Sequence, residues 1–350
     1  MSERRIYLDR SIGETRGVVT LDGRPERLLV RRDDDDPRLM LGARLLARVA
    51  SLEPALGTAF LDLGGAEAIL PFRTDARPVR GQAIQVEIRA EPRRGKLAVA
   101  RVIPGDASSG GEGAPRLLDG PTDVAAQLQA LVHDAKLVTG SEAREVADAA
   151  EAEALEVLHP LPGGGQIAIE PTRALTAIDV DLSDRKGGDA KRLTRQANLA
   201  ALGMAARLLR LKGLGGIVVM DLVGRGHDGA ALLAAARAAF GPDNPGVSIG
   251  PVGRFGTMEL SLPRRIQPIM ERLCREDGAP SDRTLAQRLI RRLQAEAAAA
   301  PGRRLVATCA PNVAAAAAPL AVALREQIGA RFAISPDPAW PRARLDVAAA

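Results

Sequence analysis

Cysteine is scarce in this chain. Only Cys274 and Cys309 occur among 350 residues. They lie far apart and in no metal-ligand spacing, so the sequence supports neither a disulfide framework nor a zinc cage. This usage fits a reducing compartment, and we expect a cytoplasmic protein.

Long apolar runs are missing as well. No window approaches the ~20 uninterrupted apolar residues that a membrane-spanning helix needs. The N-terminal segment MSERRIYLDR carries charges where a signal peptide needs an apolar core. We therefore expect no membrane segment.

The chain does have enough length and apolar content for several cores. At 350 residues and 46% hydrophobic content it is expected to form two or three globular domains. The formal net charge is +5. Nearly all the positive charge is arginine, which pairs with phosphate in a planar fork, so a polyanionic partner is favoured.

The first hundred residues have the pattern of short strands. Alternation is clear in IQVEIRA, and turn signals such as Asp22-Gly23 separate the runs. We predict a β-barrel over residues 1–103. The Gly-, Ser- and Pro-rich stretch that begins at Pro104 predicts a linker over 104–120.

An α/β core is predicted over residues 121–275. Two helices, 121–138 and 141–158, are expected to form a hairpin, and a strand, helix, strand pattern follows. The helix is predicted from Asp189 to Lys212, and a crossover of this kind joins parallel strands. Helix, strand, helix, strand then predicts a small α/β domain over 281–350.

Three acids mark the ends of the two strands that this crossover joins. Asp179 and Asp181 share one face of the first strand, and Asp221 ends the second. Open α/β sheets bind ligands at this edge. Clustered carboxylates there predict a Mg²⁺ site that also meets phosphate oxygens. The alternative, that these aspartates only cap the following turns, stays open.

The loop after Asp181 has residues suited to a phosphodiester. Arg185 and Lys186 supply positive charge, and two glycines allow close backbone approach to a helix N-terminus. His227 follows Asp221 by six residues and could reach a substrate or leaving group, but a structural role is the favoured interpretation. No Gly-x-Ser-x-Gly or Cys/His pairing is present, and metal-activated water needs neither.

Three stretches of the core resemble the ribonuclease E/G family: LPGGGQIAIEPTRALTAIDVD, GGDAKRLTRQANLAALGMAARLLRLKGLGGIVVMDLV and VGRFGTMELS. The barrel is similar to that family's OB-fold RNA-binding domain, and the last 70 residues to its small terminal domain. The resemblance covers most of the chain except Pro104 to about His159. It implies a nuclease core with an RNase H-like remnant and a DNase I-like subdomain.

The resemblance also implies Mg²⁺-dependent endonucleolytic cleavage of single-stranded RNA. The family's two metal-binding aspartates fall on Asp179 and Asp221, and its assisting asparagine falls on Asp181. Arg254 matches a position near the core that is suited to phosphate. In the barrel, one stacking aromatic is matched by Phe60 and the basic loop residue by Lys96, whereas the second aromatic falls on Ile69.

Two parts of the family pattern are reduced in this chain. The segment between barrel and core is too short for the full 5′-monophosphate sensor, so a preference for 5′-monophosphate RNA is not implied. The zinc-link motif is reduced to LCRED, with Cys274 retained and Asp277 in place of the second thiolate. We expect no zinc-linked tetramer, and a homodimer is left open.

Three functions follow from these observations. The first is a Mg²⁺-dependent endoribonuclease that uses metal-activated water. The alternative is a non-catalytic RNA-binding protein on a ribonuclease E/G scaffold, because the departures fall on functional parts of the family. A DNA-acting nuclease is less favoured, because the barrel resembles an RNA binder.

Overall fold

The computed structural model describes residues 3–103, 113–182, 189–241 and 245–349. Contacts divide the chain into two compact units, neither of which is continuous in sequence. Unit 1 comprises residues 1–35, 123–149 and 269–350. Unit 2 comprises residues 36–122 and 150–268.

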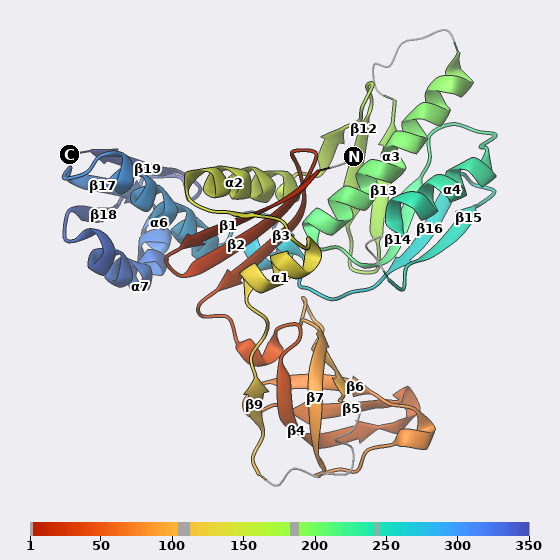
Figure 1. The fold of residues 1–350 in the computed structure, drawn as a ribbon, viewed down its shortest axis with the longest axis horizontal. Helices are drawn as coiled ribbons and strands as arrows, with labels where there is room; N and C mark the ends of the chain where they lie inside the picture. Colours follow the sequence, from red (N-terminus) through yellow and green to blue (C-terminus); the bar gives the residue numbers. More distant parts are fainter. Residues whose placement is uncertain (1–2, 104–112, 183–188, 242–244, 350) are drawn as a thin grey trace. The chain divides into compact units, whose positions relative to one another are not determined.

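The N-terminal sheet of unit 1 is a meander with one added strand (Figure 1). Its strands are β1 (Arg4–Ser11), β2 (Glu14–Leu21), β3 (Arg24–Arg32) and β10 (Leu137–Val138). The first three are antiparallel, and β10 pairs in parallel with β1. Helix α1 (Val124–Leu131) covers this sheet with Val124 and Leu128, which pack against apolar residues of β1 and β2.

This sheet differs from the single barrel predicted over residues 1–103. The first three strands pair with a strand of residues 137–138 and lie outside the barrel. Alternation and turn residues are alike in a meander and in a barrel, so the local pattern could not assign these strands. The two predicted helices after residue 121 are separated by β10, and the second is α2 (Ser141–Leu155).

The C-terminal part of unit 1 is a small α/β fold. Its elements are α5 (Ile269–Leu273), α6 (Asp282–Ala299), β17 (Leu305–Cys309), α7 (Pro311–Ile328), β18 (Phe332–Pro336) and β19 (Leu345–Ala349). The predicted helix, strand, helix, strand order is present, and β19 adds a third strand antiparallel to β17. Leu289, Leu293 and Ala307 are completely buried in its core.

A closed five-stranded barrel forms the first part of unit 2. Its strands are β4 (Arg44–Glu53), β5 (Thr58–Asp62), β6 (Glu67–Pro71), β7 (Ala83–Ala90) and β8 (Ala98–Val102), with three short 3₁₀ turns η1 (Pro37–Leu39), η2 (Pro54–Leu56) and η3 (Thr74–Ala76). They pair in the order β4-β5-β6-β8-β7 and close back on β4. Ring closure in a five-stranded Greek-key order is the arrangement of an OB-fold.

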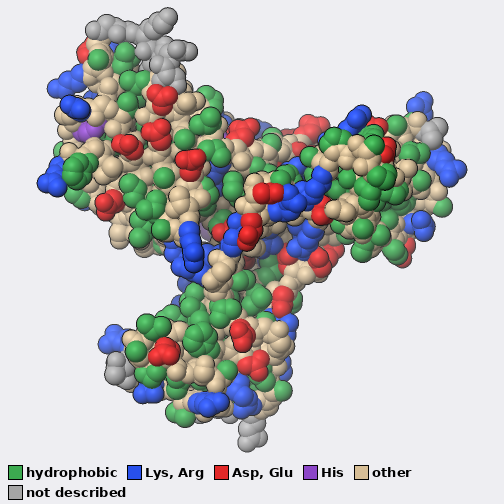
Figure 2. Space-filling model, turned by 180° about the vertical axis from the view of Figure 1, so that it is seen from behind, with side chains coloured by type: hydrophobic (Ala, Val, Ile, Leu, Met, Phe, Trp, Pro, Cys, Tyr) green, Lys and Arg blue, Asp and Glu red, His purple; other side chains and the backbone are tan. Residues whose placement is uncertain are grey.

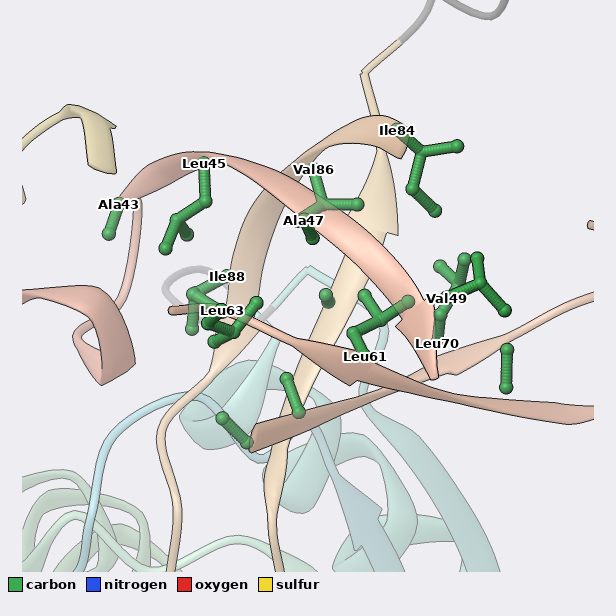
Figure 3. Packing of buried hydrophobic residues seen from close by; sticks show 14 residues of the cluster. Ala43, Leu45, Ala47, Val49, Leu61, Leu63, Leu70, Ile84, Val86 and Ile88 are labelled. Carbon is green, nitrogen blue, oxygen red and sulfur yellow. The ribbon is translucent and has the colours of Figure 1, made fainter. Parts of the chain in front are cut away.

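Alternate residues of the barrel strands fill its interior (Figure 3). Leu45, Leu61, Val86 and Ile88 are completely buried there, as period-two strands require. The predicted linker over 104–120 differs in its last part, because β9 (Arg116–Asp119) pairs with the start of β4. Residues 104–112 lie outside the described part of the chain.

The second part of unit 2 is a six-stranded sheet in the order β11-β12-β13-β14-β16-β15. Its strands are β11 (Leu158–Pro160), β12 (Gln166–Pro171), β13 (Thr176–Asp181), β14 (Gly216–Asp221), β15 (Ser248–Val252) and β16 (Thr257–Leu262). Helices α3 (Ala190–Lys212) and α4 (Gly229–Phe240) lie on one face (Figure 1). The predicted helix from Asp189 to Lys212 is confirmed, as is its parallel crossover.

Candidate functional site

Asp179 and Asp221 are direct partners on neighbouring strands. β13 and β14 run parallel, and the register pairs Asp179 with Asp221. Neighbouring strands lie about 4.8 Å apart, and residues in register point to the same face. Both side chains are exposed, between buried residues of the opposite face. The structure thus brings together the two carboxylates that the sequence singled out.

The connection between these strands explains the register. α3 begins after Asp189, whose carboxylate accepts a hydrogen bond from the backbone N–H of Arg192 at 3.1 Å. It ends at Gly213, which takes a left-handed conformation with φ of 66°. The buried Asn198 of α3 donates to the carbonyl of Val223 at 3.0 Å and accepts from its N–H at 3.1 Å. The crossover helix therefore also fixes the chain just beyond Asp221.

The surroundings of Asp179 shift its pKa. Partial burial, followed by the charges of Asp221 and Asp181, raises the pKa of Asp179 above its ordinary value. Glu170 on β12 adds a smaller contribution in the same direction. Like charges at this distance favour protonation or a bound cation. The carboxylates therefore lie close enough to interact electrostatically.

Asp181 lies two residues further along β13, with Gln166 of β12 opposite it. The Gln166 side-chain amide donates to Asp181 Oδ2 at 3.4 Å. Within the described ranges, no set of three His, Cys, Asp or Glu side chains could hold a metal ion. The geometry is therefore a close pair, Asp179 and Asp221, with Asp181 beside it and hydrogen-bonded to an amide.

The face that carries these acids is free of the helices that cover the opposite face. α3 and α4 lie over the buried face, whereas Ile217 on the other face is 53% exposed. Seen from behind, this part of unit 2 presents several acidic side chains on its surface (Figure 2). Glu259 of β16 is among the exposed residues of this sheet. A cationic ligand is the electrostatic complement of such a face.

The turn between β15 and β16 lies at the same sheet edge. Thr257 is the register partner of Asp221, and the backbone N–H of Leu222 donates to Gly256 O at 3.2 Å. Arg254 is exposed and lies over the Phe255 ring, with Cζ 4.5 Å from the centroid. Phe255 has the apolar side chain that is typical of a core residue, yet this side chain is 78% exposed.

His227 lies in the loop after β14 and packs against this turn. A Cβ at Gly256 would lie 3.3 Å from His227 Nε2. That nitrogen is buried and has no hydrogen-bond partner among the described residues. The contact places His227 behind the turn. Its suggested reach to a substrate stays a prediction.

The two remaining site residues predicted in the nuclease core lie outside the described part of the chain. Arg185 and Lys186 lie in the segment 183–188, outside the described residues. Their proposed role toward phosphate stays a prediction from the sequence. The segment follows Asp181 by two residues, and α3 begins soon after it.

Phe60 lies on the outer wall of the barrel. It is 37% exposed, whereas its neighbours Ala59 and Leu61 are completely buried. The register aligns Phe60 with Ile69, and Ile69 with Val99, so an apolar strip crosses three strands. Sequence reasoning found Phe60 and the Ile69 replacement but missed the aliphatic continuation at Val99.

The predicted basic residue of the barrel lies near the end of this strip. Lys96 is in the β7–β8 turn, where its backbone N–H donates to Arg93 O at 2.7 Å. Two residues further, β8 begins at Ala98, and Val99 contributes to the strip. Lys96 thus lies three residues before Val99 of the apolar strip, and single-stranded nucleic acid binding combines cationic with apolar groups.

The reduced zinc motif forms a hydrogen-bonded turn. Cys274 is 7% exposed, and the turn is closed by a hydrogen bond from Arg275 N to Ala279 O at 2.8 Å. The Asp277 carboxylate pairs with the Arg275 guanidinium and accepts from Ala279 N at 3.0 Å. One thiol and one engaged carboxylate do not fit a structural zinc site, which needs four ligands.

No helix in the described portion of the chain is long and apolar enough to cross a membrane.

Comparison with known proteins identifies the region that contains the acid pair. The model of the ribonuclease E/G family matches residues 126–265. This range includes both aspartates and begins inside the segment before His159 that we expected to fall outside the resemblance. The barrel strands β4 to β8 lie outside the matched range.

Curated relatives match over a shorter stretch. Ribonuclease E of Haemophilus influenzae is 38% identical over 107 residues, which cover 30% of this chain and 11% of that protein. Ribonuclease E of Escherichia coli is 37% identical over 107 residues, covering 30% of this chain and 10% of that protein.

A third relative, ribonuclease E of a Nostoc species, is 35% identical over 127 residues, covering 35% of this chain and 18% of the relative. The matched stretch therefore spans between a tenth and a fifth of the length of these three relatives. Residues 126–265 thus match the ribonuclease E/G family, and part of this chain is similar to ribonucleases E.

Proposed function

We propose that this protein is a Mg²⁺-dependent endoribonuclease that cleaves single-stranded RNA. The observation that supports this most strongly is that Asp179 and Asp221 are register partners near the carboxyl ends of two neighbouring strands, with both side chains exposed. The relatives named above are ribonucleases E, and the range matched by the ribonuclease E/G family model includes this pair. Hydrolysis of a phosphodiester bond is the reaction that the site and the family share.

The acid pair fits a magnesium ion by its donor chemistry. Mg²⁺ takes one or two carboxylates, keeps several waters and binds phosphate oxygens. Asp179 and Asp221 supply two carboxylates. Partial burial and then the charge of Asp221 raise the pKa of Asp179, and a cation would relieve the repulsion between the two acids. When bound, a divalent ion supplies an activated water and stabilises the charge of in-line displacement.

The protein's own residues would orient the substrate around this pair. Asp181, held by the Gln166 amide, places a further acceptor two residues from Asp179. Arg254 brings positive charge to the same sheet edge, beside the strand partner of Asp221. On the barrel, the Phe60 strip and Lys96 would hold unpaired bases and backbone of the same RNA strand.

The cellular setting belongs to the same proposal. Both cysteines are buried and neither forms a disulfide within the described residues, which is consistent with a reducing cytoplasm. RNA is the partner that the arginine-rich composition and the barrel wall favour.

Replacing either aspartate of the pair gives the direct test. Asp179→Asn and Asp221→Asn should lower cleavage of a fluorogenic single-stranded RNA in Mg²⁺ by at least ~100-fold, because metal ligands matter at least as much as their supporting residues. RNA binding, measured by fluorescence anisotropy, should be retained. Glu170→Gln is the matched control, since it removes an acid from the same face and leaves the pair intact.

Three results would count against the proposal. Equal cleavage by the wild type and both variants would identify a contaminating nuclease. No cleavage in any divalent metal, with RNA binding retained, would favour the non-catalytic RNA-binding protein. A DNA substrate cleaved as fast as RNA would favour the DNA-acting alternative.

A further inference from the structure

Phe255 stands apart from the other aromatic residues of the chain. The sequence contains only five Phe, one Trp and one Tyr. Tyr7, Phe240 and Phe332 are buried, Phe60 is 37% exposed, and Phe255 is 78% exposed. One exposed apolar side chain is ordinary in itself. The surroundings of Phe255 are what call for an explanation.

The turn that carries Phe255 is tightly held. Gly253 N donates to Thr257 O at 2.8 Å, and Gly256 N donates to Gly253 O at 3.0 Å. Gly256 has φ of +87°, a conformation that side chains rarely adopt, and His227 packs directly behind it. The ring is thus presented on a short, braced turn, where little conformational entropy would be lost on binding.

This turn is connected to the acid pair. Thr257 is the strand partner of Asp221, and the neighbouring Gly256 carbonyl accepts the Leu222 N–H. Partner Cα atoms in antiparallel strands lie about 5 Å apart, and two further residues add at most ~7 Å. Phe255 therefore lies within a few nucleotides' reach of a phosphodiester bond held at Asp179 and Asp221.

The Phe255 ring already engages a cation. Arg254 Cζ lies 4.5 Å from its centroid, which is cation–π distance. A guanidinium held beside a ring offers charge for phosphate, and the ring offers a π-face for a base. With most of the side chain exposed, ring surface remains for a stacking partner.

We propose that Phe255 is a stacking platform for one nucleobase of single-stranded RNA beside the bond held at Asp179 and Asp221, and that Arg254 contacts an adjacent phosphate. This inference rests on the proposed function, because it assigns the RNA a position at that site. A protein partner could also cover an exposed ring. The acid pair and the arginine at the same edge favour nucleic acid, which brings both a phosphate and a planar base.

A base-stacking measurement that does not depend on cleavage tests this proposal. The fluorescent base 2-aminopurine, placed at successive positions of a short single-stranded RNA, is quenched when it stacks on an aromatic ring. With wild type at saturation in EDTA, one position should be quenched more strongly than the others. Phe255→Leu should remove that extra quench and weaken binding by about tenfold, whereas Phe255→Tyr should preserve both.

Two controls separate this proposal from others. Phe60→Leu should weaken RNA binding and leave the position-specific quench intact at saturation, because it alters only the barrel wall. Asp179→Asn should keep the quench while losing cleavage. If quench persists but no variant or wild type cleaves RNA, the stacking site stands and the nuclease function fails.

The opposite results would overturn the stacking site. These are no position-specific quench in wild type, or equal quench in wild type and Phe255→Leu. An unchanged quench together with an altered sedimentation coefficient for Phe255→Leu would assign the ring to a protein contact instead.

Discussion

The buried acids of unit 1 and the acid pair of unit 2, Asp179 and Asp221, lie in contrasting surroundings. In unit 1, the buried acids Asp9, Glu14 and Glu26 each have an arginine at ion-pair distance. In unit 2, no lysine or arginine among the described residues forms an ion pair with Asp179 or Asp221, which stand side by side. The same residue type therefore stabilises one unit and carries local repulsion in the other.

Burial explains the difference. Glu14 is 1% exposed and contacts both Arg32, at 2.7 Å, and Arg291. A charge that deep must be paired, because the fold cannot otherwise offset its desolvation. Asp179 and Asp221 are exposed, so water moderates their repulsion and the fold tolerates it. Exposed acids that form no ion pair therefore indicate a binding site more specifically than buried acids that pair with arginine.

Breaking the buried network should produce the largest effect. Glu14→Gln removes the counter-charge of the buried Arg32 guanidinium and one of the two carboxylates that pair with the buried Arg291. We expect a loss of about 3–5 kcal/mol in the free energy of unfolding, measured by urea titration. Asp75→Asn, which breaks an exposed pair with Arg73, should leave the urea midpoint unchanged. Similar effects from both substitutions would contradict the distinction between the units.

Lys212 of unit 2 is buried like the acids of unit 1, but the groups that accept its hydrogen bonds are neutral. Its amine donates to the backbone carbonyls of Glu153, Ala154 and Glu156 at the end of α2. Burial is the main cause that lowers the pKa of Lys212 to about 8, while the charges of Glu153 and Glu156 oppose this shift. A cation without a direct carboxylate partner is thus easier to deprotonate than the paired arginines of unit 1.

The Lys212 shift predicts a rise of stability with pH. Between pH 8 and the ordinary value of 10.5, the folded protein binds fewer protons than the unfolded chain, so the free energy of unfolding increases with pH. The gain across this window should reach up to ~3 kcal/mol. Urea titrations of wild type and Lys212→Met at several pH values measure how much of this gain comes from Lys212. A parallel pH profile in the variant would show that Lys212 is not its source.

The acid pair should give the smallest effect on stability, with a distinctive sign. A raised pKa means that folding favours protonated Asp179, so stability is greatest at low pH and falls as pH rises through the raised value. In EDTA at pH 7, Asp179→Asn should therefore stabilise the protein, by less than ~1 kcal/mol because the site is exposed. Asp181→Asn should act in the same direction. Differential scanning fluorimetry measures both.

Addition of Mg²⁺ should make wild type more stable than Asp179→Asn. Wild type should gain thermal stability on addition of Mg²⁺, because the ion binds only the folded state, and Asp179→Asn should not. If Asp179→Asn is less stable than wild type in EDTA, the carboxylates do not repel each other and the cation site loses its electrostatic basis.

The sequence allowed the core of the site to be predicted because its determinants are local. A 23-residue helix between two six-residue strands enforces a parallel crossover, and an offset of two residues between the strands pairs Asp179, rather than the terminal Asp181, with Asp221. Apolar alternation in the barrel strands likewise revealed a β-structure. These features depend on residues close in the chain, which pattern analysis reads well.

Features that depend on distant pairing were missed. Arg291 in RLIRRL has the pattern of a solvated helix face, yet it is 4% exposed because Glu14 of β2 meets it. Strands β1 to β3 look like barrel strands, and only their pairing with β10 separates them. Phe255 has the apolar character of a core residue, and its exposure follows from a turn whose hydrogen bonds the sequence does not display.

The alternation of segments between the units has a consequence for synthesis on the ribosome. The barrel strands β4 to β8 are continuous in sequence and can pair as soon as they emerge. The segment of residues 1–35, by contrast, belongs with residues 269–350. Its strands can pair with one another early, but unit 1 cannot complete its packing until residues 269–350 have been synthesised, which leaves part of this sheet's apolar surface exposed in the nascent chain.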